Sequence, residues 1–114
     1  MKLADTPCQP CRGDSPALTP DEIARHLRQL PRWTLIAENG VDQLERGFDF
    51  ERYRDCLDFC QRLGEIAEQA DHHPLMIIAW GKVTVRWWTH AIGGLHLNDV
   101  VMAARSDRLY AQFG

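Results

Sequence analysis

The chain has 114 residues, a length that suits one compact domain with a core of its own. Hydrophobic residues make up 45% of the sequence and charged residues 25%, and the formal net charge is −3 at pH 7. This balance offers nucleic acid no electrostatic attraction, and no stretch approaches the ~20 apolar residues that a membrane-spanning helix needs. The first residues, MKLADTPCQPC, lack the apolar run of a signal peptide, so we expect a cytoplasmic protein.

Residues 1–18 are rich in Pro, Cys, Gly and Ser, which predicts a flexible arm ahead of a single domain over residues 19–114. The arm holds Cys8 and Cys11 in a C-x-x-C spacing, but no second pair completes a zinc site near them. A redox pair would be expected between a strand and a helix. An inert tail is the favoured interpretation, weak metal binding or redox chemistry is the alternative, and the role of the arm stays open.

The first part of the domain predicts a helix followed by a hairpin. Thr19-Pro20 is typical of a helix start, with a Thr cap and Pro in the first helical position, and Pro31 ends the helix. Apolar and polar residues then alternate over residues 33–37, as in a half-buried strand. Asn39-Gly40 is a strong hairpin signal, and residues 41–50 predict the return strand.

A long helix is predicted from Glu51 to about Ala70, with apolar residues on more of its surface than one core-facing side requires. We therefore expect it to pack on the sheet with one side and against a partner subunit with the other. The two stripes are Tyr53, Leu57, Cys60, Gly64 and Ala67, and beside them Cys56, Phe59, Leu63, Ile66 and Ala70.

A second hairpin and a last helix complete the pattern. The strands are predicted over residues 75–79 and 83–87 with a turn at Gly81-Lys82, and the helix runs from about Leu97 to Tyr110. The resulting order is α-β-β-α-β-β-α. It predicts an α+β fold, an antiparallel four-stranded sheet with helices on one face.

Three of the five histidines, His72, His73 and His90, fall where the long helix ends and the second hairpin begins and finishes. A turn at Gly81-Lys82 would pair residue i with about residue 163 − i and so set His73 opposite His90. Imidazole titrates near pH 6.5 and exchanges protons at neutral pH. The three histidines therefore predict an acid–base site.

Two carboxylates are candidates to support these imidazoles. Glu68 lies four residues before His72 on the helix and is expected to orient or charge it, and Asp99 lies in the first turn of the last helix, where the dipole favours an ionised carboxylate. Each residue has a structural alternative, since His72 could cap helix carbonyls and Asp99 could be only a helix-start acid. We expect His26 and His96 to be structural.

A zinc site is the competing hypothesis for the histidines. Two adjacent histidines point to different sides of an extended chain, and the helical H-x-x-x-H spacing is absent. We therefore expect no metal at this site.

At these residues the chain resembles the pterin-4a-carbinolamine dehydratases, and its bacterial branch in particular. The motif is E-x3-H-H-P-x5-W-x9-H-x8-D, which begins at Glu68, passes through Trp80 and ends at Asp99. The resemblance extends from about Thr19 to Asp107. It implies the same α+β fold, and homodimers or homotetramers formed through the long helix and the sheet edges.

The resemblance implies dehydration of 4a-hydroxytetrahydrobiopterin to quinonoid dihydropterin, which recycles tetrahydrobiopterin for aromatic amino-acid hydroxylases. Pterin would be the substrate, and no cofactor or metal is required. By this resemblance His72, His73 and His90 carry proton transfer, Asp99 holds a histidine in its working tautomer, and Glu68 supports His72. The residues expected to contact the pterin are Asp71, Pro74, Thr89, Ala91 and Ile92. Which histidine is the acid and which the base stays open.

A non-catalytic interaction module is the alternative function. Animal relatives bind the dimerisation helix of a transcription factor through the long helix. No basic patch or other partner signal in this sequence favours that alternative.

Overall fold

The computed structural model describes residues 3–9 and 15–113, and its element order confirms the predicted α-β-β-α-β-β-α arrangement. The helices and strands are α1 (Pro20–Leu27), β1 (Thr34–Glu38), β2 (Val41–Asp49), α2 (Tyr53–Ala70), β3 (Leu75–Ala79), β4 (Lys82–Trp87) and α3 (Leu97–Tyr110). Two short 3₁₀ helices, η1 (Leu3–Asp5) and η2 (Ala111–Phe113), lie outside this pattern.

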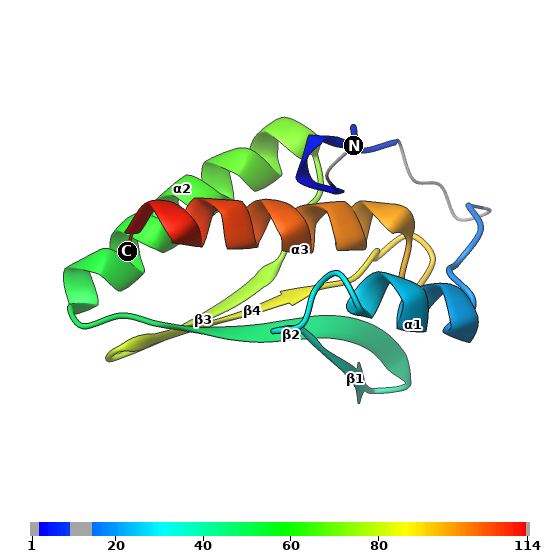
Figure 1. The fold of residues 1–114 in the computed structure, drawn as a ribbon, viewed down its shortest axis with the longest axis horizontal. Coiled ribbons are helices and arrows are strands. Elements are labelled where there is room, and N and C mark those ends of the chain that lie inside the picture. Colours follow the sequence, from blue (N-terminus) through cyan, green and yellow to red (C-terminus); the bar gives the residue numbers. More distant parts are fainter. Residues whose placement is uncertain (1–2, 10–14, 114) are drawn as a thin grey trace.

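The four strands form one antiparallel sheet in the order β1-β2-β4-β3. The helices lie on one side of this sheet, with α2 and α3 stacked across it and α1 beside the first hairpin (Figure 1). In that hairpin Glu38 pairs with Val41, and both loop residues, Asn39 and Gly40, have positive φ angles of 52° and 77°. The Asn-Gly pair therefore makes the tight hairpin turn that the sequence predicts.

The second hairpin turns one residue earlier than predicted. Ala79 pairs with Lys82, so Trp80-Gly81 forms the loop, and Gly81 supplies its positive φ of 80°. Leu75 pairs with Arg86 and not with Trp88, which a turn at Gly81-Lys82 would have placed opposite it. The prediction of a direct His73–His90 pairing is therefore wrong. Glycine serves here as the third of four turn residues, the position that requires positive φ in a type II turn.

The core lies between the sheet and the helices. The helix-facing residues of β4, Val83, Val85 and Trp87, are fully buried against α2 and α3. On α2, Phe59 is buried while Tyr53 stays 47% exposed, so the helix carries apolar residues beyond its core-facing side. The predicted partner subunit on that side stays a prediction. Within the described ranges, no helix combines the length and apolarity needed to cross a membrane.

Residues 3–9, drawn in blue beside the N label in Figure 1, lie against α3. Arg105 on α3 donates from Nε to the carbonyl of Ala4 at 3.0 Å and from Nη2 to that of Thr6 at 2.9 Å. The flexible arm predicted over residues 1–18 stays a prediction, and Cys11 of the C-x-x-C spacing lies outside the described residues.

Candidate active site

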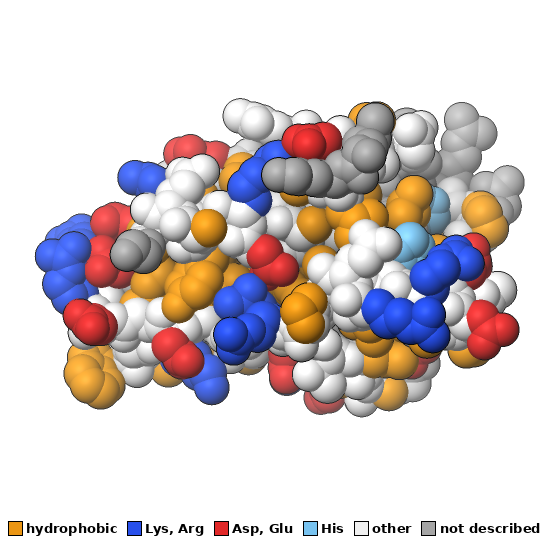
Figure 2. Space-filling model, in the orientation of Figure 1, with side chains coloured by type: hydrophobic (Ala, Val, Ile, Leu, Met, Phe, Trp, Pro, Cys, Tyr) orange, Lys and Arg blue, Asp and Glu red, His pale blue; other side chains and the backbone are white. Residues whose placement is uncertain are grey.

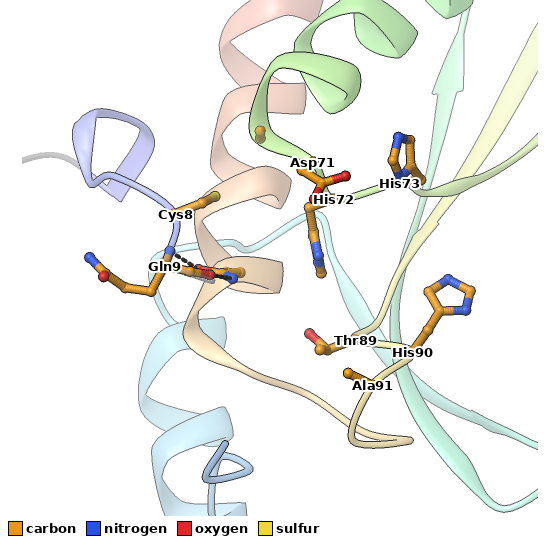
Figure 3. Close-up of a pocket in the computed structure, with 10 residues that line it drawn as sticks. Cys8, Gln9, Asp71, His72, His73, Thr89, His90 and Ala91 are labelled. Atoms are coloured by element: carbon orange, nitrogen blue, oxygen red, sulfur yellow. Dashed lines mark hydrogen bonds between the residues drawn. The ribbon is translucent and has the colours of Figure 1, made fainter. Parts of the chain in front are cut away.

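A pocket of about 610 Å³ opens where α2 ends and where the chain passes from β4 into α3. This volume lies in the range of small-molecule sites, which is roughly 300–1,000 Å³. Figure 3 shows His72 between two flanks, with Cys8 and Gln9 on one side and His73 and His90 on the other. The lining residues are Cys8, Gln9, Ala70, Asp71, His72, His73, Thr89, His90, Ala91 and Asn98.

The end of α2 turns His72 into the protein. Asp71 takes the left-handed conformation, with φ of 51°. The His72 amide then donates to the Ala67 carbonyl at 3.1 Å, and the Asp71 amide donates to the Glu68 carbonyl at 3.2 Å. These two bonds are those of a Schellman motif, which ends the helix and reverses the chain. As a result the His72 side chain points inward and only 8% of the residue is exposed.

His72 is fixed by a carboxylate and an aromatic ring. Its Nε2 lies 2.6 Å from Oδ1 of Asp99, which is completely buried. The imidazole stacks on the Trp87 indole with ring centroids 5.7 Å apart and an interplanar angle of 6°. A carboxylate can only accept, so an ionised Asp99 requires a proton on Nε2. Nδ1 is then the ring nitrogen of neutral His72 that can exchange a proton.

The second oxygen of Asp99 is also occupied. Thr89 donates its hydroxyl to Oδ2 at 2.7 Å, and the His96 amide donates to the same oxygen at 2.9 Å. His96 is the N-cap of α3, and its Nδ1 accepts from the Asn98 amide at 3.1 Å. The capping box that starts α3 thus also orients the carboxylate that holds His72. The structural role expected for His96 is confirmed.

Glu68 does not contact His72 as predicted; its Oε1 lies 2.7 Å from Nε2 of His73. The i, i+4 rule holds only inside a helix, and the left-handed Asp71 interrupts it before His72 is reached. His73 then returns to the side of α2 that carries Glu68. Both side chains are well exposed, so this contact is much more solvated than that of His72 with Asp99.

His90 lies on a short loop that a single bridge between Thr89 and Gly94 closes. The Thr89 amide donates to the Gly94 carbonyl at 2.8 Å, and Gly93 allows the tight return with a φ of 59°. The exposed imidazole of His90 lies against Trp88, with ring centroids 4.6 Å apart and the two ring planes tilted by 36°. His90 therefore reaches the same flank as His73 through this loop, without the strand pairing that the sequence predicted (Figure 3).

The pocket contains six of the residues singled out from the sequence: His72, His73, His90, Asp71, Thr89 and Ala91. Within the described part of the chain, Pro74 and Ile92 are not among its lining residues. Sequence reasoning missed Cys8, Gln9, Ala70 and Asn98. The position of Asn98 beside Asp99 was a usable signal, whereas Cys8 and Gln9 lie far from the other residues in sequence and show no periodicity.

Two further properties define the chemistry of the site. In residues 3–9 and 15–113, no group of three or more His, Cys, Asp or Glu side chains has the geometry to hold a metal ion. The face in Figure 2 mixes acidic and basic side chains without a broad area of one sign. The arrangement offers three imidazoles around one pocket, one of them buried and carboxylate-bound and two open to solvent, a set suited to moving protons.

Comparison with known proteins identifies close relatives of the chain. Residues 16–109 match the sequence model of the family described as pterin 4 alpha carbinolamine dehydratase. A protein of Chlorobaculum tepidum, provisionally named a pterin-4-alpha-carbinolamine dehydratase, is 46% identical over 108 residues, which cover 95% of this chain and 97% of that protein. One of Marinobacter nauticus with the same provisional name is 44% identical, with 95% of this chain and 97% of that protein covered.

A solved structure shares the fold. The crystal structure of a transcriptional coactivator/pterin dehydratase from Brucella melitensis matches with a TM-score of 0.76 and 28% sequence identity. The match covers 83% of this chain and 99% of that one.

Proposed function

This chain belongs to the pterin 4 alpha carbinolamine dehydratase family, and we propose that it removes water from 4a-hydroxytetrahydrobiopterin to give quinonoid dihydropterin. One observation carries the mechanism we propose. The His72 imidazole lies 2.6 Å from a fully buried carboxylate, in a pocket that His73 and His90 also line. The family membership supports the reaction, and this contact supports histidine as the group that performs it.

The dehydration needs two proton movements. An imidazolium gives a proton to the 4a-hydroxyl as the C4a–O bond breaks, and water leaves. A neutral imidazole takes a proton from a ring N–H, whose electron pair forms the new double bond of the product. The protein ends with the protons it began with, and no oxidant or reductant is consumed. Imidazoles suit both steps, since their ordinary pKa lies near neutral pH.

The three histidines differ in their suitability for these steps. Asp99 fixes the proton on Nε2 of His72 and would stabilise the imidazolium if Nδ1 accepts a second proton. His73 and His90 contact water and can exchange protons with it directly. We propose that all three take part. Asp71, Thr89 and Ala91 line the pocket and would contact the pterin. Pro74 and Ile92 do not line it and would contribute only by supporting residues that do.

The test is the loss of 4a-hydroxypterin absorbance in a stopped-flow instrument, with metal-free protein. We expect wild-type protein to accelerate this loss, and His73→Ala and His90→Ala to remove at least about 90% of the acceleration while the protein stays folded, since acid–base groups contribute roughly 10²–10⁴-fold. Wild-type rates in both variants would reject the mechanism, and an inactive wild-type protein would reject the function.

We further propose that the chain works in the cytoplasm and serves an aromatic amino-acid hydroxylase, which uses the dihydropterin product again once that product has been reduced to tetrahydrobiopterin. The dehydration itself would need no cofactor, since the pterin is its substrate. A homodimer or homotetramer would bury the exposed Tyr53 and Leu57 of α2. Light scattering or sedimentation of the purified chain tests the assembly.

A non-catalytic interaction module is the second candidate function. The Brucella melitensis structure is described as a coactivator as well as a dehydratase, and α2 of this chain exposes apolar side chains. This alternative predicts no dehydration by the wild-type protein, together with a partner complex that Tyr53→Ala and Leu57→Ala abolish.

A further inference from the structure

The pocket has a wall that comes from far away in the sequence. Cys8 and Gln9 line it, although the family match begins only at residue 16. Residues 3–9, called here the N-terminal segment, reach this position along α3. Arg105 holds the segment through the carbonyls of Ala4 and Thr6, at 3.0 and 2.9 Å. Because Arg105 binds main-chain atoms, it fixes the path of the segment and not merely one side chain.

Asn98 fastens the segment at the pocket. Its Oδ1 accepts from the Gln9 amide at 2.9 Å, and its Nδ2 donates to the Gln9 carbonyl at 2.6 Å. Two bonds to one residue fix both the position and the direction of the chain there, and Figure 3 draws them as dashed lines. Asn98 is only 3% exposed, so a buried amide is satisfied by this contact, and losing the contact is costly.

The same turn of α3 holds both sides of the pocket. Asn98 binds Gln9, and the next residue, Asp99, binds His72. In Figure 3, Cys8 and Gln9 lie on the flank of His72 that is opposite to His73 and His90. The N-terminal segment therefore faces the pocket from the side that carries none of the three histidines.

We propose that the N-terminal segment is a wall of the pterin site, and that Asn98 and Arg105 are positioning residues whose hold on this wall sets the affinity for pterin. The proposal rests on the proposed dehydratase function. The hydrogen-bonding groups of Gln9 that Asn98 engages are its main-chain N–H and C=O, and Cys8 packs partly buried against the core. The N-terminal segment would therefore contact the flat pterin ring with its surface and would not supply a proton to the reaction. Its loss should weaken binding without slowing the chemical step.

Arg105→Ala in the full chain tests the proposal. Arg105 lies six residues beyond Asp99 on α3, about 9 Å along the helix axis, so its effect is separable from His72. We expect KM for the 4a-hydroxypterin to rise about threefold or more, with kcat within about twofold of wild type. The reason is that the wall would stabilise the bound substrate and the transition state equally, so its loss weakens binding without slowing the chemical step. Asn98→Ala should raise KM at least as much.

Arg86→Ala is the matched control. Arg86 is partly buried like Arg105, but it lies in β4, where it forms an ion pair with Glu45 at 2.7 Å and does not hold the N-terminal segment. We expect it to change neither KM nor kcat. An Arg105→Ala protein with wild-type circular dichroism and an unchanged KM would overturn the proposal, as would a loss confined to kcat.

A second measurement uses the wild-type chain and does not depend on the folding of any variant. Iodoacetamide labelling of Cys8 is followed by peptide mapping, under reducing conditions, with and without saturating 7,8-dihydrobiopterin. We expect the pterin to slow labelling of Cys8 about fivefold or more, since a bound ring covers the wall. Cys60 on α2 does not line the pocket, and its labelling should not change. If the protein is an active dehydratase but pterin does not protect Cys8, the proposed wall is wrong and the proposed function stands. If the protein neither binds nor turns over pterin, both proposals are wrong.

Discussion

Asp99 starts α3 and holds His72 with the same carboxylate. Oδ2 accepts the His96 amide at 2.9 Å in the capping box, and Oδ1 lies 2.6 Å from Nε2 of His72. The helix start and the buried imidazole therefore depend on one side chain. This relationship explains how a charged residue can be completely buried here, since each oxygen has hydrogen-bond partners.

Asp99→Asn should lower kcat by roughly 10-fold or more. The amide can present a donor to Nε2 where the carboxylate accepted, which favours the other tautomer of His72 and removes the charge that stabilises its imidazolium. Stopped-flow kinetics measure the loss, and thermal unfolding reports the helix cap separately. A variant with wild-type kcat would show that the carboxylate only caps the helix.

Glu68→Gln should reduce kcat modestly, by less than about 10-fold, because its contact with His73 is exposed and such pairs are worth about 0–1 kcal/mol. The free energy of unfolding should stay within about 0.5 kcal/mol of the wild-type value. Glu65→Gln on the same helix, whose Oε1 accepts from Gln61 at 3.1 Å, is the control. A much larger loss of activity for Glu68→Gln, with the control unaffected, would mean that Glu68 itself transfers a proton.

Ser106→Ala should destabilise the fold by about 1–3 kcal/mol, the cost of an unsatisfied buried donor. The Trp87 indole N–H donates to Ser106 Oγ at 3.0 Å, and both residues are completely buried. Chemical denaturation with urea measures the change. If the free energy of unfolding were unaltered, the bond would contribute nothing to holding the ring on which His72 stacks.

Cys60 should resist alkylation at neutral pH. Burial, with a smaller contribution from the neighbouring Cys56, raises the pKa of the Cys60 thiol to about 11. The thiolate is the reactive form, so at pH 8 the folded protein should label about 100-fold more slowly than the unfolded chain. The rate should climb as the pH rises toward the raised pKa. Equal labelling of folded and unfolded protein, measured by mass spectrometry, would contradict this.

Local signals were sufficient for most of the fold. The Thr19-Pro20 start of α1 is confirmed by a capping box in which Thr19 Oγ1 accepts from the Glu22 amide at 3.2 Å. Asn39-Gly40 turns the first hairpin because both residues tolerate positive φ. In each case the residues that determine the structure are neighbours in sequence.

The errors arose where the local sequence allows more than one backbone conformation, or where the decisive contact joins residues far apart in the chain. Gly81 could have occupied either central position of its turn, so the register could not be obtained from the glycine alone. The partner of Glu68 depends on the left-handed backbone of Asp71, a conformation more typical of glycine. Gln9 and Asn98 are 89 residues apart in the sequence, and no local pattern around either residue predicts their contact.

The most direct test of the central claim is the single-turnover dehydration rate of His72→Gln, compared with wild type at saturating 4a-hydroxypterin. Glutamine can still reach Asp99 by a hydrogen bond but cannot exchange a proton near neutral pH. If the carboxylate-bound imidazole of His72 transfers a proton in the reaction, the rate should fall by about 10²-fold or more while pterin binding persists. A folded His72→Gln protein that dehydrates the pterin at the wild-type rate would contradict the account.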